Sequence, residues 1–426
     1  MTRRWRAAAL AALLALAAAA APVTDPAATG GPGFPRLMGM NIGAKNYDNP
    51  AYQRDLARLD VVILGFHKGW GPSADPQKSV QAMRQAVQAI KGLNPRVLVG
   101  QYTVLNEAFD NPEDLATRDL RDKLSASRWW LTDAAGKKVQ WTAQHGAWDI
   151  NYTMWAAPDA GGRRWPQWLA ERNYGVYFRD IPEFDIVYLD NVMVRPRVKA
   201  DWDRDGRDDD ADDPRILAAH YAGHAAFWDE IRKLQPRAML VGNTADADLS
   251  NAEWRNRLEG GFLEGLMGES WSIEKRAGWP AMMAFYRTVK GNLKAPQIVG
   301  FNVQGNRTDY RFFRYAYASC LLDDGYFSFT ESAKGYSSVP WFDEYDFKLG
   351  RAVSPPPPAP WMKGVWRRDF ERGVVLVNPT GEARSVTVER GLKRLSGSQD
   401  PAVNSGAPAS ELRLPAKDGI VLRRDS

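Results

Sequence analysis

The stretch DIVYLDNV, residues 185–192, has the composition of a strand buried in the middle of a parallel sheet. Its central residues, 186–189, are apolar or aromatic without interruption, as expected of a strand that is covered on both faces. The run then ends at Asp190 and Asn191, with neither Gly nor Pro to make a turn. A core strand that delivers a carboxylate at its carboxyl end indicates a functional site at that edge of the sheet.

The same pattern recurs along the chain. Short apolar runs occupy residues 37–43, 61–66, 96–102, 185–191, 238–243, 260–265, 297–303 and 325–330. Segments in which apolar residues recur with the helical period lie between them, such as QKSVQAMRQAVQAIKGL and RILAAHYAGHAAFWDEIRKL. Strand and helix therefore alternate, and this alternation predicts an α/β fold, a (β/α)8 TIM barrel over residues 36–353.

A polar residue stands at or just after the end of each apolar run. These residues are Asn41, His67, Gln101, Asp190, Asn243, Glu264, Asn302 and Glu331. In a TIM barrel the interior is packed, so functional groups gather at the carboxyl ends of the strands and in the loops that follow them. A single residue such as Asp190 is also compatible with a helix cap or an arginine pair. A polar residue at every strand end favours an active site at this rim.

The two ends of the chain differ in composition from the predicted barrel. Residues 1–21 combine three arginines with an Ala/Leu run and small residues before Pro22, which predicts a cleaved signal peptide, with an uncleaved membrane anchor as the alternative. Residues 354–361 form a Pro-rich linker. Short alternating segments in residues 362–426 predict a small all-β sandwich packed on the barrel, rather than a separate carbohydrate-binding module. We therefore expect an exported protein, periplasmic or extracellular, without stable membrane insertion after cleavage.

Charge and cysteine content exclude several classes of protein. The formal net charge is +5, and it falls to +2 when the three arginines of the signal peptide are removed. No basic stripe is interleaved with aromatic residues, so nucleic acid is not an expected partner. The single cysteine, Cys320, excludes an internal disulfide framework. His220 and His224 lack the Glu of a zinc peptidase motif, no phosphate-binding loop is present, and we expect no organic cofactor. The sequence does not indicate an oligomeric state.

The first of two long connections runs from about Thr103 to Arg164 and is rich in tryptophan. It carries Trp129, Trp130, Trp141, Trp148 and Trp155, and Trp165 and Trp168 follow at its end. Indole faces suit the C–H faces of sugar rings, and the indole N–H can donate to a hydroxyl. We expect Trp148 and the neighbouring Asp149 to bind substrate. The alternative for each tryptophan is that it builds a small core for this excursion.

The second long connection contains DWDRDGRDDDAD, residues 201–212, which has the pattern of a calcium-binding loop. The expected ligands are Asp201, Asp203, Asp205, Arg207 through its carbonyl, Asp209 and Asp212, and Gly206 permits the sharp turn. The loop departs from the pattern in having Asp rather than Glu at the twelfth position and in lacking a clear preceding helix. It predicts a structural Ca²⁺ that stiffens the rim at Asp190; a solvated acidic loop is the alternative.

Several motifs together resemble one family. The motifs that carry the resemblance are DIVYLDNV, GGFLEGLMGES, LLDDGYFSFTES, WFDEYDFKLG, GVWRRDFERGVVLVNPT and LPAKDGIVL. The chain resembles glycosyl hydrolase-like family 15 and, more distantly, the barrels of endo-α-1,4-polygalactosaminidases. The resemblance covers about residues 36 to 424. It implies a TIM barrel with a C-terminal β domain and hydrolysis of a polysaccharide.

Glycoside cleavage requires one carboxyl group that protonates the leaving oxygen and another that attacks or activates water. We predict Asp190, beside Asn191, as the ionised nucleophile or base. Glu264 follows the apolar GGFL, which favours retention of its proton, so we predict it as the acid. Glu107, Glu269 and Glu331 are competing candidates.

The remaining rim residues are predicted to bind substrate: Asn41, His67, Gln101, Trp148, Asp149, Asn243, Glu269, Asn302 and Glu331. Two other functional classes stay open. One is a catalytically inactive, polysaccharide-binding barrel involved in exopolysaccharide export. The other is a carbohydrate deacetylase or esterase, although the sequence shows neither a metal triad nor a serine nucleophile motif.

Overall fold

The computed structural model of the chain describes residues 33–72 and 76–424. The predicted signal peptide, residues 1–21, lies outside the described residues. Within the described ranges, no helix combines the length and the apolar character that are needed to cross a bilayer.

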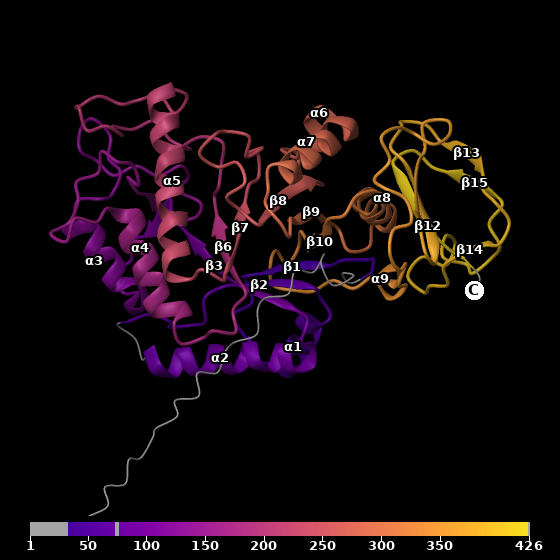
Figure 1. Ribbon diagram of the computed structural model, residues 1–426, viewed down its shortest axis with the longest axis horizontal. Coiled ribbons are helices and arrows are strands. Elements are labelled where there is room, and N and C mark those ends of the chain that lie inside the picture. The colour runs from indigo at the N-terminus through magenta and orange to yellow at the C-terminus, as the bar shows by residue number, and fades with distance from the viewer. Residues whose placement is uncertain (1–32, 73–75, 425–426) are drawn as a thin grey trace, which may run out of the picture.

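A closed parallel barrel forms the centre of the molecule (Figure 1). Its strands are β1 (Met38–Asn41), β2 (Val61–Leu64), β3 (Leu98–Val104), β6 (Ile186–Asp190), β7 (Met239–Asn243), β8 (Gly260–Met267), β9 (Ile298–Gly305) and β10 (Tyr326–Glu331). Neighbouring strands pair in that order and all in parallel. A parallel bridge between Leu37 and Phe327 brings β10 back against β1. The predicted TIM barrel is confirmed.

Helices cover the outside of the barrel. They are α1 (Pro50–Ala57), α2 (Pro76–Leu93), α3 (Arg118–Ala126), α4 (Trp165–Asn173), α5 (Pro214–Leu234), α6 (Ile273–Ala277), α7 (Trp279–Gly291), α8 (Tyr310–Leu321) and α9 (Asp343–Asp346). Short polar residues fix several starts. Asn49 accepts bonds from the first backbone N–H groups of α1, and Asp213 caps α5, in which Pro occupies the first turn.

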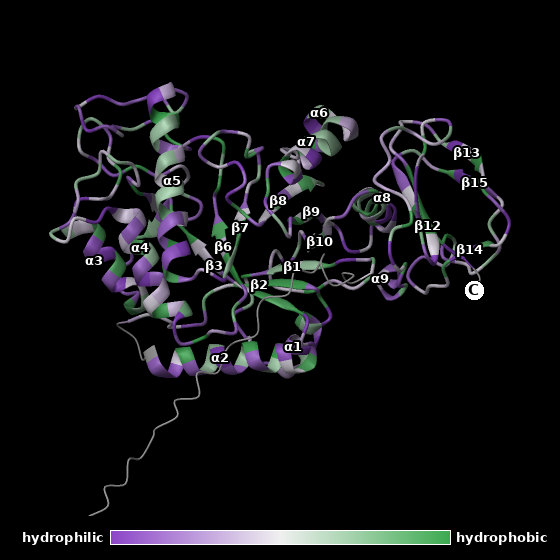
Figure 2. Ribbon diagram, in the orientation of Figure 1, coloured by the Kyte–Doolittle hydropathy of each residue, from purple (hydrophilic) through white to green (hydrophobic). Residues whose placement is uncertain are grey.

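Alternate residues of each strand face opposite sides of the barrel wall. One set packs in the interior: Met38, Met40, Val61, Ile63, Ile186, Tyr188, Met239, Val241, Phe262, Ile298 and Tyr326. The other set packs against the helices and includes Val62, Leu64, Val99 and Val187. Figure 2 shows hydrophobic residues along β2 and β6, and a mixture of hydrophobic and hydrophilic residues along α2. The inward series ends, at the carboxyl edge, in polar side chains.

The two long connections pack on each other next to the end of β6. In the first, β4 (Glu107–Phe109) pairs antiparallel with β5 (Ala147–Asp149). The amide of Asn151 donates to the carbonyl of Trp202 at 2.8 Å, and the backbone N–H of Asp201 donates to the carbonyl of Thr132 at 3.0 Å. Trp129 and Trp165 are fully buried in this region, so they build its core.

The C-terminal residues form a β domain that contacts the barrel. Strands β11 (Trp366–Phe370), β12 (Gly373–Asn378), β16 (Asp418–Arg424) and β14 (Leu392–Arg394) make one sheet, and β13 (Arg384–Thr387) pairs with β15 (Glu411–Leu414). Helix α8 packs against β12 and β16 (Figure 1). Arg314 of α8 bonds to Asp418 at 3.2 Å, and Arg368 bonds to Asp324 at 2.6 Å. A Cβ at Gly419 would lie 2.5 Å from Ala318, so this close approach requires glycine.

Candidate active site

Asn243 joins the two predicted catalytic carboxyl groups. It ends β7, which lies between β6 and β8 in the barrel, and Asp190 and Glu264 stand on those two flanking strands. The Asn243 Nδ2 donates to Asp190 Oδ1 at 2.9 Å and to Glu264 Oε2 at 2.7 Å. Both acids remain partly exposed to solvent. The structure therefore brings these three residues together at the carboxyl edge of the barrel.

Each carboxyl group also accepts a hydrogen bond from a tyrosine. Tyr102, on β3, donates to Asp190 Oδ2 at 2.5 Å. Tyr336, in the loop after β10, donates to Glu264 Oε1. Every oxygen of the pair thus has a donor, which fixes the orientation of both carboxyl groups.

The pKa of each acid is raised, but for partly different reasons. Burial raises the pKa of Asp190, and hydrogen bonds from Tyr102 and Asn243 oppose that rise. Burial also raises the pKa of Glu264, and the negative charge of Asp190 is the second cause. The negative charge of an ionised Asp190 therefore favours the protonated form of Glu264. A pair in this state offers one nucleophile or base and one acid at the same pH.

A bulge next to Glu264 sets its position on β8. The pairing register between β8 and β9 shifts between Leu263 and Met267, and Gly265 has a φ of +59°. The backbone N–H of Gly265 donates to Asn302 Oδ1 at 3.0 Å. Asn302 is fully buried and its amide donates to the hydroxyls of Ser328 and Thr330. Asn302 therefore holds the backbone that carries Glu264.

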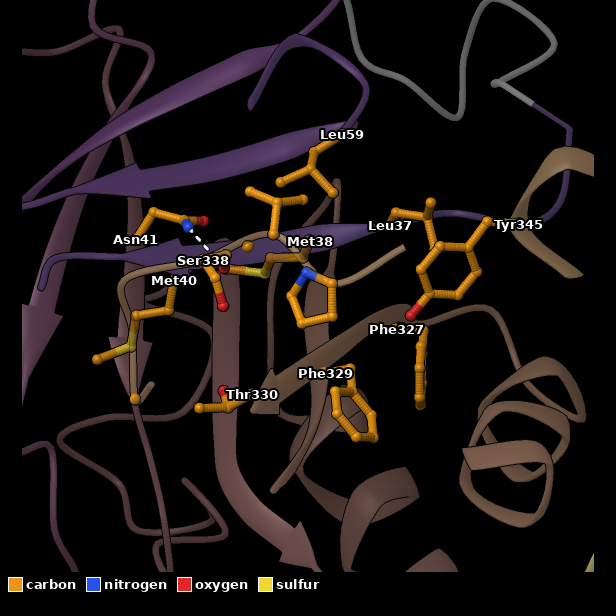
Figure 3. A pocket seen from close by; sticks show the side chains of 14 residues that line it. Leu37, Met38, Met40, Asn41, Leu59, Phe327, Phe329, Thr330, Ser338 and Tyr345 are labelled. Atoms are coloured by element: carbon orange, nitrogen blue, oxygen red, sulfur yellow. Dashed lines mark hydrogen bonds between the residues drawn. The ribbon is translucent and has the colours of Figure 1, made fainter. Parts of the chain in front are cut away.

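Asn41 has a similar indirect place. Its amide donates to the carbonyl of Ser338 at 3.1 Å, and the backbone N–H of Gly43 donates to the carbonyl of Tyr336 at 3.0 Å. Figure 3 shows the bond from Asn41 to Ser338 beside a cavity of about 20 Å³ between β1, β10 and this loop. Asn41 is buried, and its bond to Ser338 holds the loop that carries Tyr336.

A second polar cluster adjoins Asp190. Arg197 donates to Glu107 at 2.7 Å, the indole N–H of Trp141 donates to the same carboxylate at 3.1 Å, and the Arg197 guanidinium lies 4.5 Å from the Trp141 ring centroid. Asp149 lies 3.8 Å from Arg197; burial raises its pKa to about 6, against the lowering effect of that arginine. Asn191 contacts Glu107 at 3.5 Å. The ion pair with Arg197 therefore gives Glu107 a structural role in this cluster.

Two exposed tryptophans contact residues that adjoin the carboxyl pair. Trp141 is 41% exposed and joins the cluster beside Asp190. Trp271 is 46% exposed, and its ring lies so close to Gly265 that a side chain there would collide with it. The residue after Glu264 is therefore covered by an indole.

Other predicted substrate-binding residues lie elsewhere. Gln101 is fully buried and shares the outward series of Val99, so Tyr102 takes the inward position. Leu98 and Tyr102 pack with the interior series, so the alternation along β3 turns Gln101, which lies between them, toward the helices. His67 bonds to the carbonyl of Lys68, outside the cluster.

Trp148, Glu269 and Glu331 also lie outside the bonded pair. Trp148 is on the face of β5 opposite Asp149, where Lys138 lies 5.0 Å from its ring. Glu331 accepts a bond from Ser338 at 3.4 Å. Glu269 follows β8, and its backbone N–H donates to Ser272 at 2.9 Å. Its charge contributes to the raised pKa of Tyr336, so it stands near the acid side of the site.

Part of the predicted calcium loop converges. Carboxylate oxygens of Asp201, Asp203 and Asp209 lie within 4.8 Å of one another, and Gly206 turns the chain with a φ of +88°. The other proposed side-chain ligands point differently. Asp205 accepts from the backbone N–H of Arg207 at 2.9 Å, and Asp212 pairs with Arg195 at 2.6 Å.

Arg215 also engages the converging carboxylates, at 3.0 Å from Asp203 and 3.4 Å from Asp209. One oxygen of Asp201 is buried without a hydrogen-bond partner among the described residues. The oxygen ligands suit Ca²⁺ in type, although they are fewer than its usual six to eight. The calcium site stays a prediction.

Comparison with known proteins places this architecture among carbohydrate-active barrels. The model of hypothetical glycosyl hydrolase family 15 matches residues 93–374. Amy13B of Eubacterium rectale superposes with a TM-score of 0.52 at 11% identity, over 92% of this chain and 97% of that chain. The α-amylase of Geobacillus thermoleovorans, complexed with acarbose, gives a TM-score of 0.50 at 11% identity, over 92% and 98%. These structures show the shared fold. Among curated proteins, no relative matches the sequence.

Proposed function

The chain belongs to hypothetical glycosyl hydrolase family 15, and we propose that it cleaves a polysaccharide by means of Asp190 and Glu264. Membership of the family makes the protein a glycoside hydrolase; the residues and the substrate are the proposal. The observation that supports it most directly is the hydrogen-bonded unit of Asp190, Asn243 and Glu264 at the barrel rim. Two carboxyl groups in different protonation states are what glycoside cleavage requires.

The other rim acids fit the catalytic roles less well. Glu107 is engaged by both Arg197 and Trp141. Glu331 lies on the outward series of β10 and bonds to Ser338. Neither shares a donor with Asp190. We therefore assign Asp190 as nucleophile or base and Glu264 as the acid.

A polymeric substrate is supported by the exposed tryptophans. Trp141 bonds to Glu107, Trp271 covers Gly265, the residue after Glu264, and each exposes more than a third of its surface. Large aromatic faces of this kind suit sugar rings. Two such faces near the ends of β6 and β8 suit a chain of sugars that continues beyond the cleaved bond.

Location and metal content belong to the same proposal. We propose export because residues 1–21 have the composition of a signal peptide. We also propose that Asp201, Asp203 and Asp209 hold a structural Ca²⁺, which is supported by their convergence. The acidic loop packs on the first long connection, which carries Trp141, so an ion in the loop would stiffen this side of the site.

The proposal is tested by incubating the mature protein, residues 22–426, with a panel of bacterial exopolysaccharides and measuring reducing ends and bound protein. We expect new reducing ends with at least one polymer. Glu253→Gln, which changes an exposed glutamate, is the matched control and should release them at the wild-type rate. A wild-type protein that binds a polymer and never releases reducing ends would favour the inactive polysaccharide-binding barrel.

A further inference from the structure

The distance between the two catalytic carboxyl groups of a glycosidase indicates whether the enzyme retains or inverts the anomeric configuration. Inverting enzymes separate their two carboxyl groups by roughly 6.5–9.5 Å, because a water must fit beside the sugar, whereas retaining enzymes hold them about 5–5.5 Å apart. Here one nitrogen atom lies 2.9 Å from an oxygen of Asp190 and 2.7 Å from an oxygen of Glu264. The oxygens that share this donor can be no farther apart than the sum of those distances, and two carboxyl groups held this close suit the retaining arrangement.

From this geometry we infer that the enzyme acts by double displacement, with retention of anomeric configuration, and that it also transfers glycosyl groups to alcohols. The inference rests on the proposed function, since it requires Asp190 and Glu264 to be the catalytic pair. It adds the order of bond changes and a second activity.

In the first step, a carboxylate oxygen of Asp190 forms a bond to the anomeric carbon. The glycosidic C–O bond breaks, its electron pair goes to the leaving oxygen, and that oxygen takes the proton of Glu264. The product is a glycosyl ester of Asp190. Tyr102 and Asn243 hold the attacking carboxylate in place, and a hydrogen bond from Tyr102 remains available to the ester oxygen.

In the second step, the ionised Glu264 takes a proton from water as the water oxygen bonds to the anomeric carbon. The ester C–O bond breaks and its electron pair returns to Asp190, so both groups regain their starting states. Two displacements at one carbon restore its original configuration. Because the ester persists until a nucleophile arrives, an alcohol that reaches Glu264 replaces water and yields a new glycoside.

Access to this second step is provided on the Glu264 side. Glu264 is partly exposed, and Trp271 presents an indole that is 46% exposed next to Gly265. A sugar stacked on this ring would lie next to the end of β8, which carries Glu264. Acceptor sugars are therefore expected to compete with water more effectively than their bulk concentration implies.

The test uses the wild-type enzyme with a polysaccharide that it cleaves, with and without methanol. Proton NMR in the first minutes, before mutarotation, gives the configuration of the new reducing ends, and mass spectrometry detects methyl glycosides. We expect nearly all first-formed ends to keep the configuration of the cleaved bond, with methyl glycosides of that same configuration.

Inverted ends without methyl glycosides would overturn this inference and leave the proposed function standing. If no reducing ends form with any polymer, the proposed function fails together with the inference. Trp271→Ala provides a further readout in the active enzyme: the ratio of transfer to hydrolysis with an oligosaccharide acceptor should fall, whereas the ratio with methanol should not change. An equal fall with both acceptors would contradict the role of Trp271.

Discussion

The Nδ2 of Asn243 donates to Asp190 at 2.9 Å and to Glu264 at 2.7 Å, so a single amide group holds both acids of the site. This orientation of the amide suits an ionised Asp190, which can only accept hydrogen bonds and would be repelled by the amide oxygen. The Asn243 Oδ1 is buried and has no hydrogen-bond partner among the described residues. An unpaired buried carbonyl oxygen lowers stability, so this amide is held for its donor, which lies between the two acids.

Asn243→Asp is the first prediction. The variant keeps the shape of the side chain but replaces the shared donor with a third carboxyl group beside the two acids. We expect kcat to fall by about 10²–10³, the effect typical of losing one preorganised donor. The comparison is Asn46→Asp, at an exposed position, which should keep wild-type activity. Near-normal turnover of the Asn243 variant would show that the bridge is not needed.

The two tyrosines should control opposite limbs of the pH–rate profile. The hydrogen bond from Tyr102 lowers the pKa of Asp190, so Tyr102→Phe should move the acidic limb to higher pH. The bond from Tyr336 lowers the pKa of Glu264, so Tyr336→Phe should move the alkaline limb to higher pH. The first variant narrows the active range and the second extends it. The measurement is the pH profile of kcat/KM for both variants, with Tyr174→Phe as the control. Limbs that do not shift in the two variants would contradict the assignment of Asp190 and Glu264 to these limbs.

His220 should make the protein less stable in acid. It is fully buried, and burial lowers its pKa to about 4, whereas an unfolded histidine has a pKa of about 6.5. The folded state therefore favours the neutral form of His220. The contribution of this neutral form to the free energy of unfolding is complete above pH 6.5 and is lost as the pH falls toward 4. At pH 4.5 the free energy of unfolding is about 2–3 kcal/mol lower for this reason.

Urea unfolding of wild type and His220→Gln at pH 7 and pH 4.5 measures this contribution. The stability advantage of the wild type over the variant should shrink at the lower pH. An advantage that is the same at both values would mean that His220 does not titrate on unfolding. The paired comparison removes the effects of the buried acids, because the variant retains them.

Chelation tests the acidic loop. If Asp201, Asp203 and Asp209 bind Ca²⁺, the ion relieves their mutual repulsion, and EDTA should lower the melting temperature. Asp210→Asn, at an exposed position paired with Lys199, should leave the calcium response unchanged, whereas Asp203→Asn should abolish it. Identical melting curves with and without EDTA, together with no calcium in elemental analysis, would exclude the site.

The sequence predicted the barrel because its signal is repeated and physical: each apolar run must be covered on both faces, and the helices between them supply the cover. It also predicted that Asp190 and Glu264 lie near each other, since strand ends meet at one edge of a parallel barrel. Gln101 shows the limit of this reasoning. Its position near the end of the apolar run was predicted correctly, but the alternation along β3 puts Leu98 and Tyr102, and not Gln101, in the interior series.

Contacts made by loops had no comparable signal. Tyr336 reaches Glu264 from a loop that is held by Asn41 and Gly43, far away in the sequence. Arg197 reaches Glu107 only because the two long connections pack together. Asn302 was expected to bind substrate, but the bulge at Gly265 gives its amide a backbone partner. Each of these positions depends on tertiary packing rather than on periodicity.

The central claim is that Asp190 and Glu264 perform the catalysis, and the direct measurement is kcat for Asp190→Asn and Glu264→Gln on a polysaccharide that the wild type cleaves. Both variants keep the shape of the side chain, so they should still bind the polymer and fold as the wild type does. We predict that each lowers kcat by at least about 10³, because the nucleophile or the proton donor is lost. Near-normal turnover by either variant, with turnover abolished in Glu107→Gln, Glu269→Gln or Glu331→Gln, would contradict the account.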